Sequence, residues 1–263
     1  MSNRDIKKII GAVNFRDIGG IICNGSSVVG FGKIFRSDRL SLLNEDDLSI
    51  LDGLCLRAIF DLRSRREREA DPTCWTGVGV ETHVFRPGHK RRLVDMAADY
   101  PATMVGAQTL MLDFYAELPR TMGHVFGEIL RRIADGAFPC IIHCSAGKDR
   151  TGMAVALLLS ALDCDRSAIL IDYAASSHAR RLEGAMVRSM ARDPSVARFR
   201  EQYPADALAV MTEARPEYLV AALDAIDREY GSMNAYLAGI GIDEPLIARL
   251  RAQLLEPMEK GRE

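Results

Sequence analysis

Short apolar runs alternate along the first two thirds of the chain with longer segments in which apolar and charged residues recur at helical spacing. Each run contains isoleucine, valine or phenylalanine and is bounded by charge, glycine or proline, which is typical of a strand. Strands are predicted at residues 31–36, 57–62, 81–85 and 138–143. Because strands that alternate with helices form parallel sheets covered on both faces, the pattern predicts an α/β fold with a mainly parallel central sheet flanked by helices.

Capping residues mark the starts of two helices between these strands. Asn44 precedes three acidic residues, and Ser64 lies three residues before Glu67, which is the spacing of a capping box. Further helices are predicted within residues 93–134 and 151–162, where the apolar residues follow a helical period.

The two ends of the chain depart from this alternating pattern. Residues 18–29 contain an Asn24-Gly25 pair between apolar residues, which predicts a β-hairpin. In the last third, residues 172–215 are rich in alanine, arginine and methionine at helical spacing, and residues 216–255 are also helical in pattern. Residues 172–263 are therefore predicted to form a helical cover over the sheet. We therefore predict a single domain over residues 1–263; a domain boundary at the start of the helical cover is the alternative.

The composition is that of a soluble globular protein, with 48% hydrophobic and 27% charged residues among 263. The formal net charge is only -2, whereas nucleic-acid-binding proteins usually carry a basic excess, so no nucleic-acid partner is expected. The most apolar run, residues 153–162, is too short to cross a bilayer, and the first residues lack the apolar core of a secretory signal. We expect a cytoplasmic protein without a transmembrane segment, with non-classical secretion left open.

Six cysteines are scattered through the chain without CxxC pairs. Because this spacing matches neither a zinc site nor a disulfide framework, a reducing compartment and no metal or organic cofactor are expected. Cys140 and Cys144 flank one apolar run, and an extended strand would hold them about 13 Å apart, which is beyond the reach of a disulfide.

The segment with candidate chemistry is CIIHCSAGKDRTG, which begins at Cys140 and ends at Gly152. A predicted buried strand delivers Cys144 into a tight loop that ends at a helix, and Arg150 follows six residues after the cysteine. The N–H groups of such a loop and the positive end of the helix form an anion site, and the planar fork of Arg150 can bind two oxygens. The predicted phosphate-binding residues are Ser145, Ala146, Gly147, Lys148, Asp149 and Arg150.

The same positive environment stabilises a thiolate on Cys144, which makes this sulfur the predicted nucleophile. Gly147 lacks a Cβ and therefore suits a turn wrapped closely around a ligand. His143 is expected to hydrogen-bond the loop backbone, and Thr151 to donate its hydroxyl to the departing thiolate. Lys148 would add positive charge at the rim of the loop and favour highly charged substrates; the alternative is an ordinary solvated lysine.

These residues resemble the signature of the protein tyrosine phosphatase superfamily, HCxxGxxR followed by serine or threonine. The longer stretches HCSAGKDRTG, NFRDIGG, FRSD and FDLRS make the chain similar to the bacterial tyrosine/serine phosphatases of the mycobacterial PtpB type. The matches extend to Asp172-Tyr173 and to residues 230–232, so the resemblance covers most of the chain. It implies hydrolysis of phosphotyrosine, often also of phosphoserine or phosphothreonine, and in some members of phosphoinositides; phosphorylated proteins or phosphoinositides are therefore the expected partners.

A carboxylic acid is also required, because an alkoxide or phenoxide is a poor leaving group unless it is protonated. Eukaryotic tyrosine phosphatases carry this acid on a WPD loop, but Trp75 is followed here by threonine and glycine. Asp149 is the first candidate because it lies inside the phosphate loop, as the corresponding residue does in myotubularin-like enzymes. Asp61 is the second because it ends a predicted parallel strand, and Asp113 is the third. Pairing with Arg63 is the alternative role of Asp61.

Other motifs have a functional and a structural interpretation. Arg16 and Asp17 lie beside a glycine pair and could serve as ordinary turn residues. The basic run at residues 89–92 could steer anions or form a solvated face. The methionines of the C-terminal third could line a mobile lid or pack in the core; they are Met186, Met190 and Met211.

The predicted reaction is hydrolysis of phosphate monoesters through a phosphocysteine on Cys144, with Arg150 and the loop amides binding the transition state. Two alternatives from other classes remain. A rhodanese-like sulfurtransferase also presents a cysteine in an anion-binding loop, and an inactive phosphate-binding module would keep the loop without the chemistry.

Overall fold

The computed structural model describes residues 8–85, 92–177 and 201–258. Its central sheet has five strands in the order β1-β4-β7-β5-β6. Their bounds are β1 Arg16–Asp17, β4 Ile34–Ser37, β5 Ala58–Asp61, β6 Glu81–Val84 and β7 Cys140–His143. β4, β7, β5 and β6 run parallel, and only β1 at the edge is antiparallel. The predicted α/β fold with a mainly parallel sheet is confirmed.

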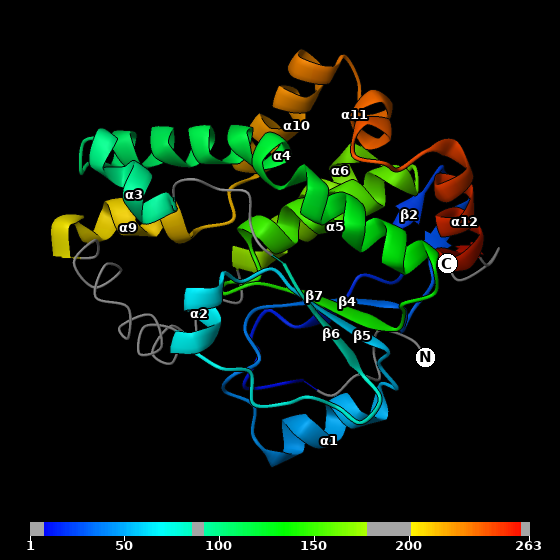
Figure 1. The fold of residues 1–263 in the computed structure, drawn as a ribbon. Coiled ribbons are helices and arrows are strands. Elements are labelled where there is room, and N and C mark those ends of the chain that lie inside the picture. Colours follow the sequence, from blue (N-terminus) through cyan, green and yellow to red (C-terminus); the bar gives the residue numbers. More distant parts are fainter. Residues whose placement is uncertain (1–7, 86–91, 178–200, 259–263) are drawn as a thin grey trace.

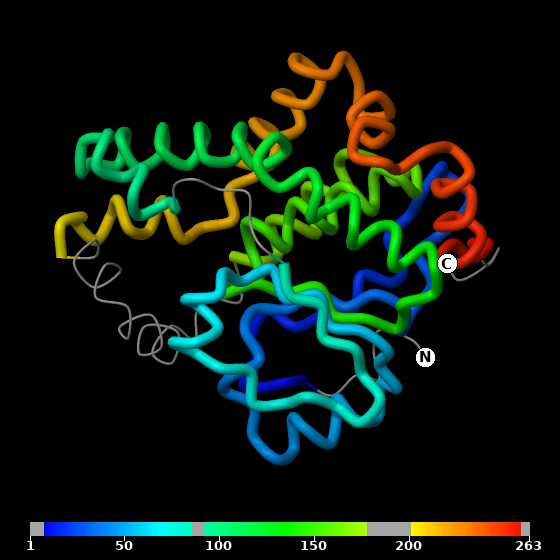
Figure 2. The backbone as a smooth tube through the Cα atoms, in the orientation of Figure 1, coloured from blue at the N-terminus to red at the C-terminus, as the bar shows by residue number. Residues whose placement is uncertain are grey.

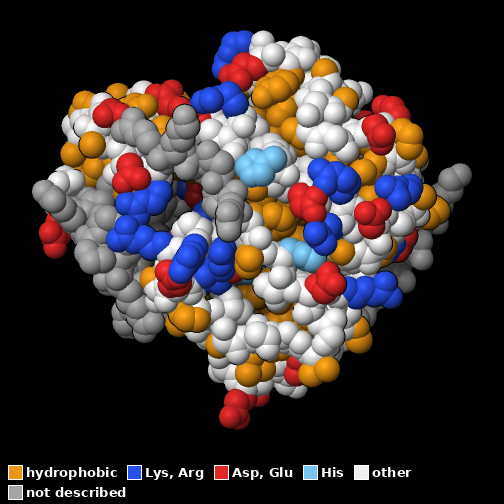
Figure 3. Space-filling view, in the orientation of Figure 1, with side chains coloured by type: hydrophobic (Ala, Val, Ile, Leu, Met, Phe, Trp, Pro, Cys, Tyr) orange, Lys and Arg blue, Asp and Glu red, His pale blue; other side chains and the backbone are white. Residues whose placement is uncertain are grey.

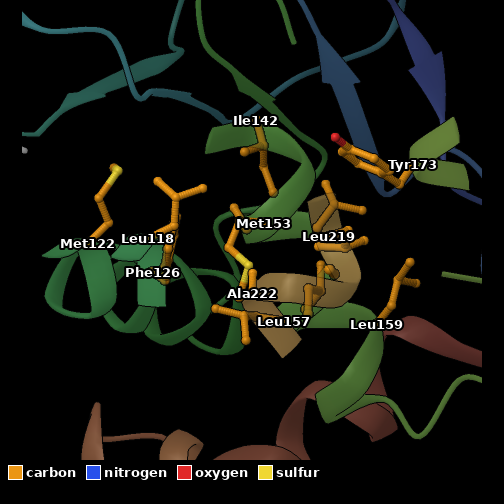
Figure 4. Packing of buried hydrophobic residues seen from close by; sticks show 14 of the residues in the cluster. Leu118, Met122, Phe126, Ile142, Met153, Leu157, Leu159, Tyr173, Leu219 and Ala222 are labelled. Carbon is orange, nitrogen blue, oxygen red and sulfur yellow. The ribbon is translucent and has the colours of Figure 1, made fainter. Parts of the chain in front are cut away.

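Helices cover both faces of this sheet (Figure 1). α1 (Glu45–Gly53) lies on one side, and α4 (Met104–Ala134) and α5 (Asp149–Ala161) lie on the other. Alternate residues of β7 therefore enter different cores: Ile141 packs in the cluster that contains Leu51 of α1, and Ile142 in the larger cluster with α4 and α5. Figure 4 shows the second cluster, in which Ile142 meets Met153 of α5. Burial on both faces explains why these strands read as continuous apolar runs.

The two predicted helix starts are confirmed. Both α1 and α2 (Arg65–Ala70) begin with a complete capping box. At α2, the Ser64 hydroxyl accepts from the Glu67 amide at 3.3 Å, and the Glu67 carboxylate accepts from the Ser64 amide at 2.7 Å. This box holds α2 directly after β5, so the carboxylate of Glu67 has a defined place beside the end of the strand.

The predicted hairpin forms β2 (Ile22–Cys23) and β3 (Ser27–Val29), which pair antiparallel. Asn24 and Gly25 take φ angles of 46° and 68° in its turn, where glycine and asparagine are favoured. A third strand, β8 (Leu255–Pro257), pairs with β3 and brings the end of the described chain beside its beginning (Figure 2). β8 was not predicted, because three residues directly after a helix show no period.

The C-terminal third forms a helical cover, as predicted. After α6 (Arg166–Ala174), the described helices are α9 (Ala205–Thr212), α10 (Pro216–Tyr230), α11 (Met233–Gly239) and α12 (Glu244–Leu254). α9 and α10 pack on α4, and α12 contacts both α4 and α5. Upstream, α3 (Leu93–Met96) and the short 3₁₀ helix Ala97–Asp99 lead into α4. The division of the chain into domains stays a prediction.

The cysteines differ from the expectation. Cys23 and Cys164 form a disulfide, although 141 residues separate them in the sequence. They meet because the hairpin packs beside the turn between α5 and α6, where the Asn24 amide also donates to the Asp163 carbonyl. Spacing along the chain carries no signal for such a pair, so the expectation of no disulfide was wrong and the predicted reducing compartment loses its support. Cys140 and Cys144 are unbonded, as expected.

None of the helices in the described ranges combines the length and the apolar character that crossing a membrane would require.

Candidate active site

The loop that follows β7 occupies the carboxyl edge of the sheet. β7 ends at His143, and α5 begins at Asp149, so residues 144–148 connect them. His143 lies in register with Ser37 at the end of β4 and with Asp61 at the end of β5. Because the carboxyl ends of parallel strands meet at one edge, three neighbouring strands deliver polar residues around Cys144.

The carbonyl groups of the loop point away from its interior. The Asn14 side-chain amide donates to the carbonyls of Ala146 at 3.0 Å and Gly147 at 2.9 Å. Arg36 donates to the Gly147 carbonyl as well, at 2.8 Å. In a trans peptide the following N–H points opposite to the carbonyl, so the next N–H groups are directed to the other side. Successive N–H groups arranged in this way form a concave anion site.

Gly147 is required at its position. Its φ is +66°, which favours glycine, and an added Cβ would lie 2.5 Å from the Ser37 carbonyl oxygen and 2.6 Å from the Asp38 nitrogen. The loop therefore packs directly on the end of β4, in a conformation that a residue with a side chain could not take without a clash.

The Glu67 carboxylate, which was predicted only to cap a helix, also binds Arg150. Glu67 binds its guanidinium at two points, Nη1 to Oε2 at 2.9 Å and Nη2 to Oε1 at 2.7 Å. Nη1 also donates to the Leu62 carbonyl at 3.0 Å. A guanidinium has five N–H groups, and the contacts with Glu67 and Leu62 use three of them. A longer contact of 3.5 Å joins Nη2 to the Ser145 hydroxyl. Nε and Nη2 share the edge that can match two oxygens of a phosphate.

The charges of this pair reinforce each other. Burial alone would raise the pKa of Glu67, but the positive charge and the hydrogen bonds of Arg150 outweigh it and lower that pKa. Burial alone would lower the pKa of Arg150, but Glu67 and then Cys144 raise it above its ordinary value. The Ser145 hydroxyl donates to Glu67 too, so one carboxylate orients both Arg150 and the first residue after the cysteine.

Cys144 and Thr151 are both buried in the loop-to-helix segment. The Cys144 side chain is almost fully enclosed, and Thr151 is fully buried in the first turn of α5. Within the described ranges, the Thr151 hydroxyl has no hydrogen-bond partner. Buried hydroxyls are rarely left in this state, so the group is available to a ligand or to the sulfur.

His143 lies against the backbone of the loop. Neither imidazole nitrogen has a partner of normal hydrogen-bond geometry in the described ranges, but the ring interacts with the backbone of Cys144, so the expected contact with the loop backbone stays a prediction. Nε2 lies 3.7 Å from Oδ2 of Asp61. Burial lowers the pKa of His143 to about 4, against the opposing charge of Asp61, so the ring is neutral at pH 7. The imidazole is therefore a neutral, fully buried group beside the loop.

Asp61 takes the structural role that was left as its alternative. Its carboxylate accepts from Nε of Arg63 at 2.9 Å and from Nη2 at 2.8 Å. Burial would raise the pKa of Asp61, but His143 and Arg63 together lower it. A carboxyl group held in the ionised form by a buried arginine is a poor proton donor, so we no longer consider Asp61 a candidate acid.

Asp149 has one anchored oxygen. Oδ1 accepts from the Tyr115 hydroxyl at 2.7 Å and lies 3.1 Å from Nζ of Lys148. The side chain remains 20% exposed. Asp149 is therefore the one of the three candidate acids that lies in the loop itself and keeps contact with solvent.

Lys148 fits neither of its two interpretations. It is only 4% exposed, and its ammonium donates to the carbonyls of Met211 at 2.6 Å and Glu213 at 3.2 Å. It also lies over the ring of Tyr218, 5.8 Å from the centroid. The side chain thus links the loop to the end of α9 instead of standing as a cation at the rim. The sequence could not show this, because the partners lie more than sixty residues away.

Comparisons with known proteins agree with this geometry. A model of the tyrosine phosphatase family matches residues 7–256. The chain belongs to the tyrosine phosphatase family. It is 28% identical to the triple specificity protein phosphatase PtpB of Mycobacterium tuberculosis, over 95% of this chain and 99% of that protein. It is 31% identical to a putative tyrosine-protein phosphatase of Cupriavidus necator, over 92% of this chain and 85% of the relative. A tyrosine-protein phosphatase of Nostoc commune is 34% identical over 83% of this chain and 73% of its own length.

The protein is therefore a phosphatase. Two arginines near its N-terminus, in the NFRDIGG and FRSD stretches, hold the loop after β7 in place. Arg16 binds Asp172 of α6, with Nε 3.0 Å from Oδ1, and the buried Arg36 pairs with the other oxygen. Arg36 also reaches the Gly147 carbonyl, so one cluster joins β1, β4, α6 and the loop. Asp17 keeps its alternative role in a turn, where its carboxylate accepts from two backbone amides.

The remaining candidates lie away from the loop or outside the described residues. Asp113 is exposed on α4 and accepts from the Tyr100 hydroxyl at 2.7 Å, a contact that raises the pKa of Tyr100 to about 12. Of the basic run, residues 89–91 lie outside the described ranges, and Arg92 pairs with Asp95. Met186 and Met190 also lie outside them, and the third lid candidate, in α9, is buried.

The described residues contain no group of three or more histidine, cysteine, aspartate or glutamate side chains placed to bind a metal ion. On the face shown in Figure 3, lysine and arginine side chains gather over the region where Figure 1 places α2. Arg65 and Arg66 of that helix are exposed, next to the glutamate that holds Arg150. The approach to the loop from this side is therefore positively charged, which favours anionic substrates.

Asp38, beneath the loop, gives this phosphatase a testable pH dependence of stability. Burial raises the pKa of Asp38 to about 6 from 3.8, so the folded state binds its proton more tightly than the unfolded state. The stability that this group contributes is complete below about pH 4 and is lost as the pH rises through 6. Asp38→Asn mimics the neutral form at every pH and keeps an acceptor for the Asn14 amide.

We expect the unfolding free energy of Asp38→Asn, relative to the natural protein, to increase by about 2 kcal/mol between pH 4 and pH 7. Urea unfolding of both proteins at several pH values measures this difference. A difference that stays constant with pH would show that Asp38 is ionised in the folded protein throughout the range.

Proposed function

We propose that this phosphatase hydrolyses phosphate monoesters through a phosphocysteine intermediate on Cys144. The observation that carries the proposal is the arrangement of the loop. Its carbonyls are bound by Asn14 and Arg36, so that its N–H groups converge on the interior, and Glu67 orients Arg150 beside the same space. A phosphate held there would lie next to a buried sulfur with positive charge on two sides.

In the first step the Cys144 thiolate attacks phosphorus, and the bond from phosphorus to the leaving oxygen breaks. The edge of Arg150 that carries Nε and Nη2, together with the loop N–H groups, binds the oxygens on which charge accumulates. Asp149 gives its proton to the leaving oxygen, so that an alcohol or phenol departs.

In the second step water attacks the phosphocysteine. Asp149, now ionised, takes a proton from that water, the bond between sulfur and phosphorus breaks, and inorganic phosphate forms. The Thr151 hydroxyl, which has no other partner in the described ranges, donates to the thiolate as it leaves. His143 is neutral and buried behind the loop and takes no part in proton transfer.

For the substrate we propose phosphotyrosine, with phosphoserine, phosphothreonine and phosphoinositides as further candidates. Support comes from the mycobacterial relative, which is named a triple specificity protein phosphatase, and from the exposed arginines of α2. Lys148 adds no charge at the rim in this structure, which weakens the case for highly charged substrates. Parallel turnover of phosphopeptides and inositol phosphates would rank these classes. A cytoplasmic location remains a prediction.

Trapping of the intermediate tests the mechanism. Acid quenching during turnover of p-nitrophenyl phosphate, followed by peptide mass spectrometry, should find one phosphoryl group on the peptide that contains Cys144. A sulfurtransferase would instead carry an extra sulfur on this residue after exposure to a sulfur donor, and an inactive phosphate-binding module would carry neither. Turnover without any labelled Cys144 peptide, or with the label on another residue, would contradict the proposal.

A further inference from the structure

Tyr115 makes a contact that the proposed mechanism has not used. It lies in the middle of α4, is fully buried, and donates its hydroxyl to Oδ1 of Asp149 at 2.7 Å. The same hydroxyl oxygen lies 2.6 Å from that of Tyr173 in α6. Two tyrosines from separate helices thus form a series of hydrogen bonds that ends at Asp149, the candidate general acid.

The direction of the hydrogen bonds that join Tyr173, Tyr115 and Asp149 follows from the protons that these groups carry. Burial raises the pKa of Tyr115 and of Tyr173 well above the ordinary value of 10, so both phenols keep their protons. A phenol has one O–H group, and that of Tyr115 is given to Asp149. Tyr173 must therefore donate to Tyr115.

The hydrogen bond from Tyr115 and the ammonium of Lys148 lie at the same oxygen of Asp149. Tyr115 donates to Oδ1, and Nζ of Lys148 lies 3.1 Å from that oxygen. An oxygen that accepts a hydrogen bond beside a positive charge is a poor place for a proton, because a proton there would face both the phenol hydrogen and the ammonium. The proton that the acid transfers is therefore directed to Oδ2.

The tyrosine hydroxyls cannot easily move away. The ring of Tyr115 packs edge-on against Tyr173, with centroids 6.0 Å apart, and lies 5.7 Å from the ring of Tyr218 in α10. Tyr173 in turn packs on the backbone of α5, where a Cβ on Gly152 would lie 2.8 Å from its ring. Close packing on three helices sets where the Tyr115 hydroxyl can lie.

We propose that Tyr115, supported by Tyr173, is a positioning residue that orients Asp149 so that Oδ2 carries the transferred proton. The proposal rests on the proposed function, because it assigns a task to Tyr115 only if Asp149 is the general acid. Tyr115 itself neither touches the substrate nor gives up its proton.

Tyr115→Phe tests this role, because it removes one oxygen and keeps the ring. Proton transfer matters most for poor leaving groups, so kcat should fall roughly 10-fold for phenyl phosphate and much less for p-nitrophenyl phosphate. In an Asp149→Asn background the same change should have no further effect. Tyr173→Phe should show the same substrate dependence with a smaller loss.

Tyr236→Phe is the matched control, since it removes a buried hydroxyl that donates to the Pro119 carbonyl at 2.9 Å, away from the loop. It should leave both substrates unaffected. Equal losses of Tyr115→Phe on both substrates, or a full further loss in the Asp149→Asn background, would overturn the positioning role. Failure of the proposed function itself would appear differently, as turnover that survives Cys144→Ser.

Discussion

Replacement of Cys144 by serine is expected to lower kcat for p-nitrophenyl phosphate by roughly 10⁵-fold or more, as removal of a nucleophile does in other enzymes with a covalent intermediate. The reason is chemical, because the proposed attack on phosphorus is made by the sulfur, whereas a serine hydroxyl is a far weaker nucleophile at neutral pH. His143 is not suited to deprotonate it, since its ring is fully buried and its Nε2 lies beside Asp61.

The same variant should keep the anion site, because the contacts that shape the loop come from Asn14 and Arg36 and not from the sulfur. Tungstate binding, measured by calorimetry, should therefore persist when turnover is lost. Cys74→Ser is the matched control, since Cys74 is an exposed, unbonded cysteine on another segment. If Cys144→Ser retained turnover, or if Cys74→Ser lost it, the assignment of the nucleophile would be refuted.

The fold and the loop could be predicted because their signals are local. The central strands β5 and β7 are short apolar runs, and both capping boxes fit within four residues. The anion loop is also contiguous: Cys144, Gly147 and Arg150 fall within one turn and the start of one helix. The structure of such segments can be predicted without knowing how the rest of the chain folds.

What the sequence could not show depends on distant pairs. The partner of Arg150 lies 83 residues earlier, and the Tyr115 hydroxyl meets Asp149 across 34 residues. Lys148 is attractive as a phosphate-binding cation in the sequence, yet its ammonium binds carbonyls at the end of α9. A charged side chain reveals its chemistry in the sequence, but its partner becomes known only when the helices are placed.

The sequence around Glu67 predicts its role in the capping box but not its contact with Arg150. As the last residue of a capping box it is fully explained by the start of α2, and its Oε2 does accept from the Ser64 amide. The same oxygen accepts from Arg150, and Oε1 binds both Arg150 and Ser145. Glu67 thus both caps α2 and orients Arg150, the group proposed to bind the transition state.

Glu67→Gln is expected to lower kcat by roughly 10²-fold, the size of effect seen when one donor to a developing oxyanion is lost. Glutamine still serves a capping box, so α2 should remain intact. It offers one oxygen and one NH₂ group where the carboxylate offered two acceptors, so one N–H of Arg150 would face another donor. The guanidinium must then turn, and its edge with Nε and Nη2 no longer faces the phosphate.

Glu69→Gln provides the control on the same helix, because Glu69 is exposed and pairs with the exposed Arg65. Steady-state kinetics should show a fall in kcat for Glu67→Gln that exceeds any rise in KM, since loss of the negative charge leaves the loop more positive and ground-state phosphate still binds. Near-natural kcat in Glu67→Gln, with unchanged thermal stability, would mean that Arg150 holds its orientation through the Leu62 carbonyl and the substrate alone.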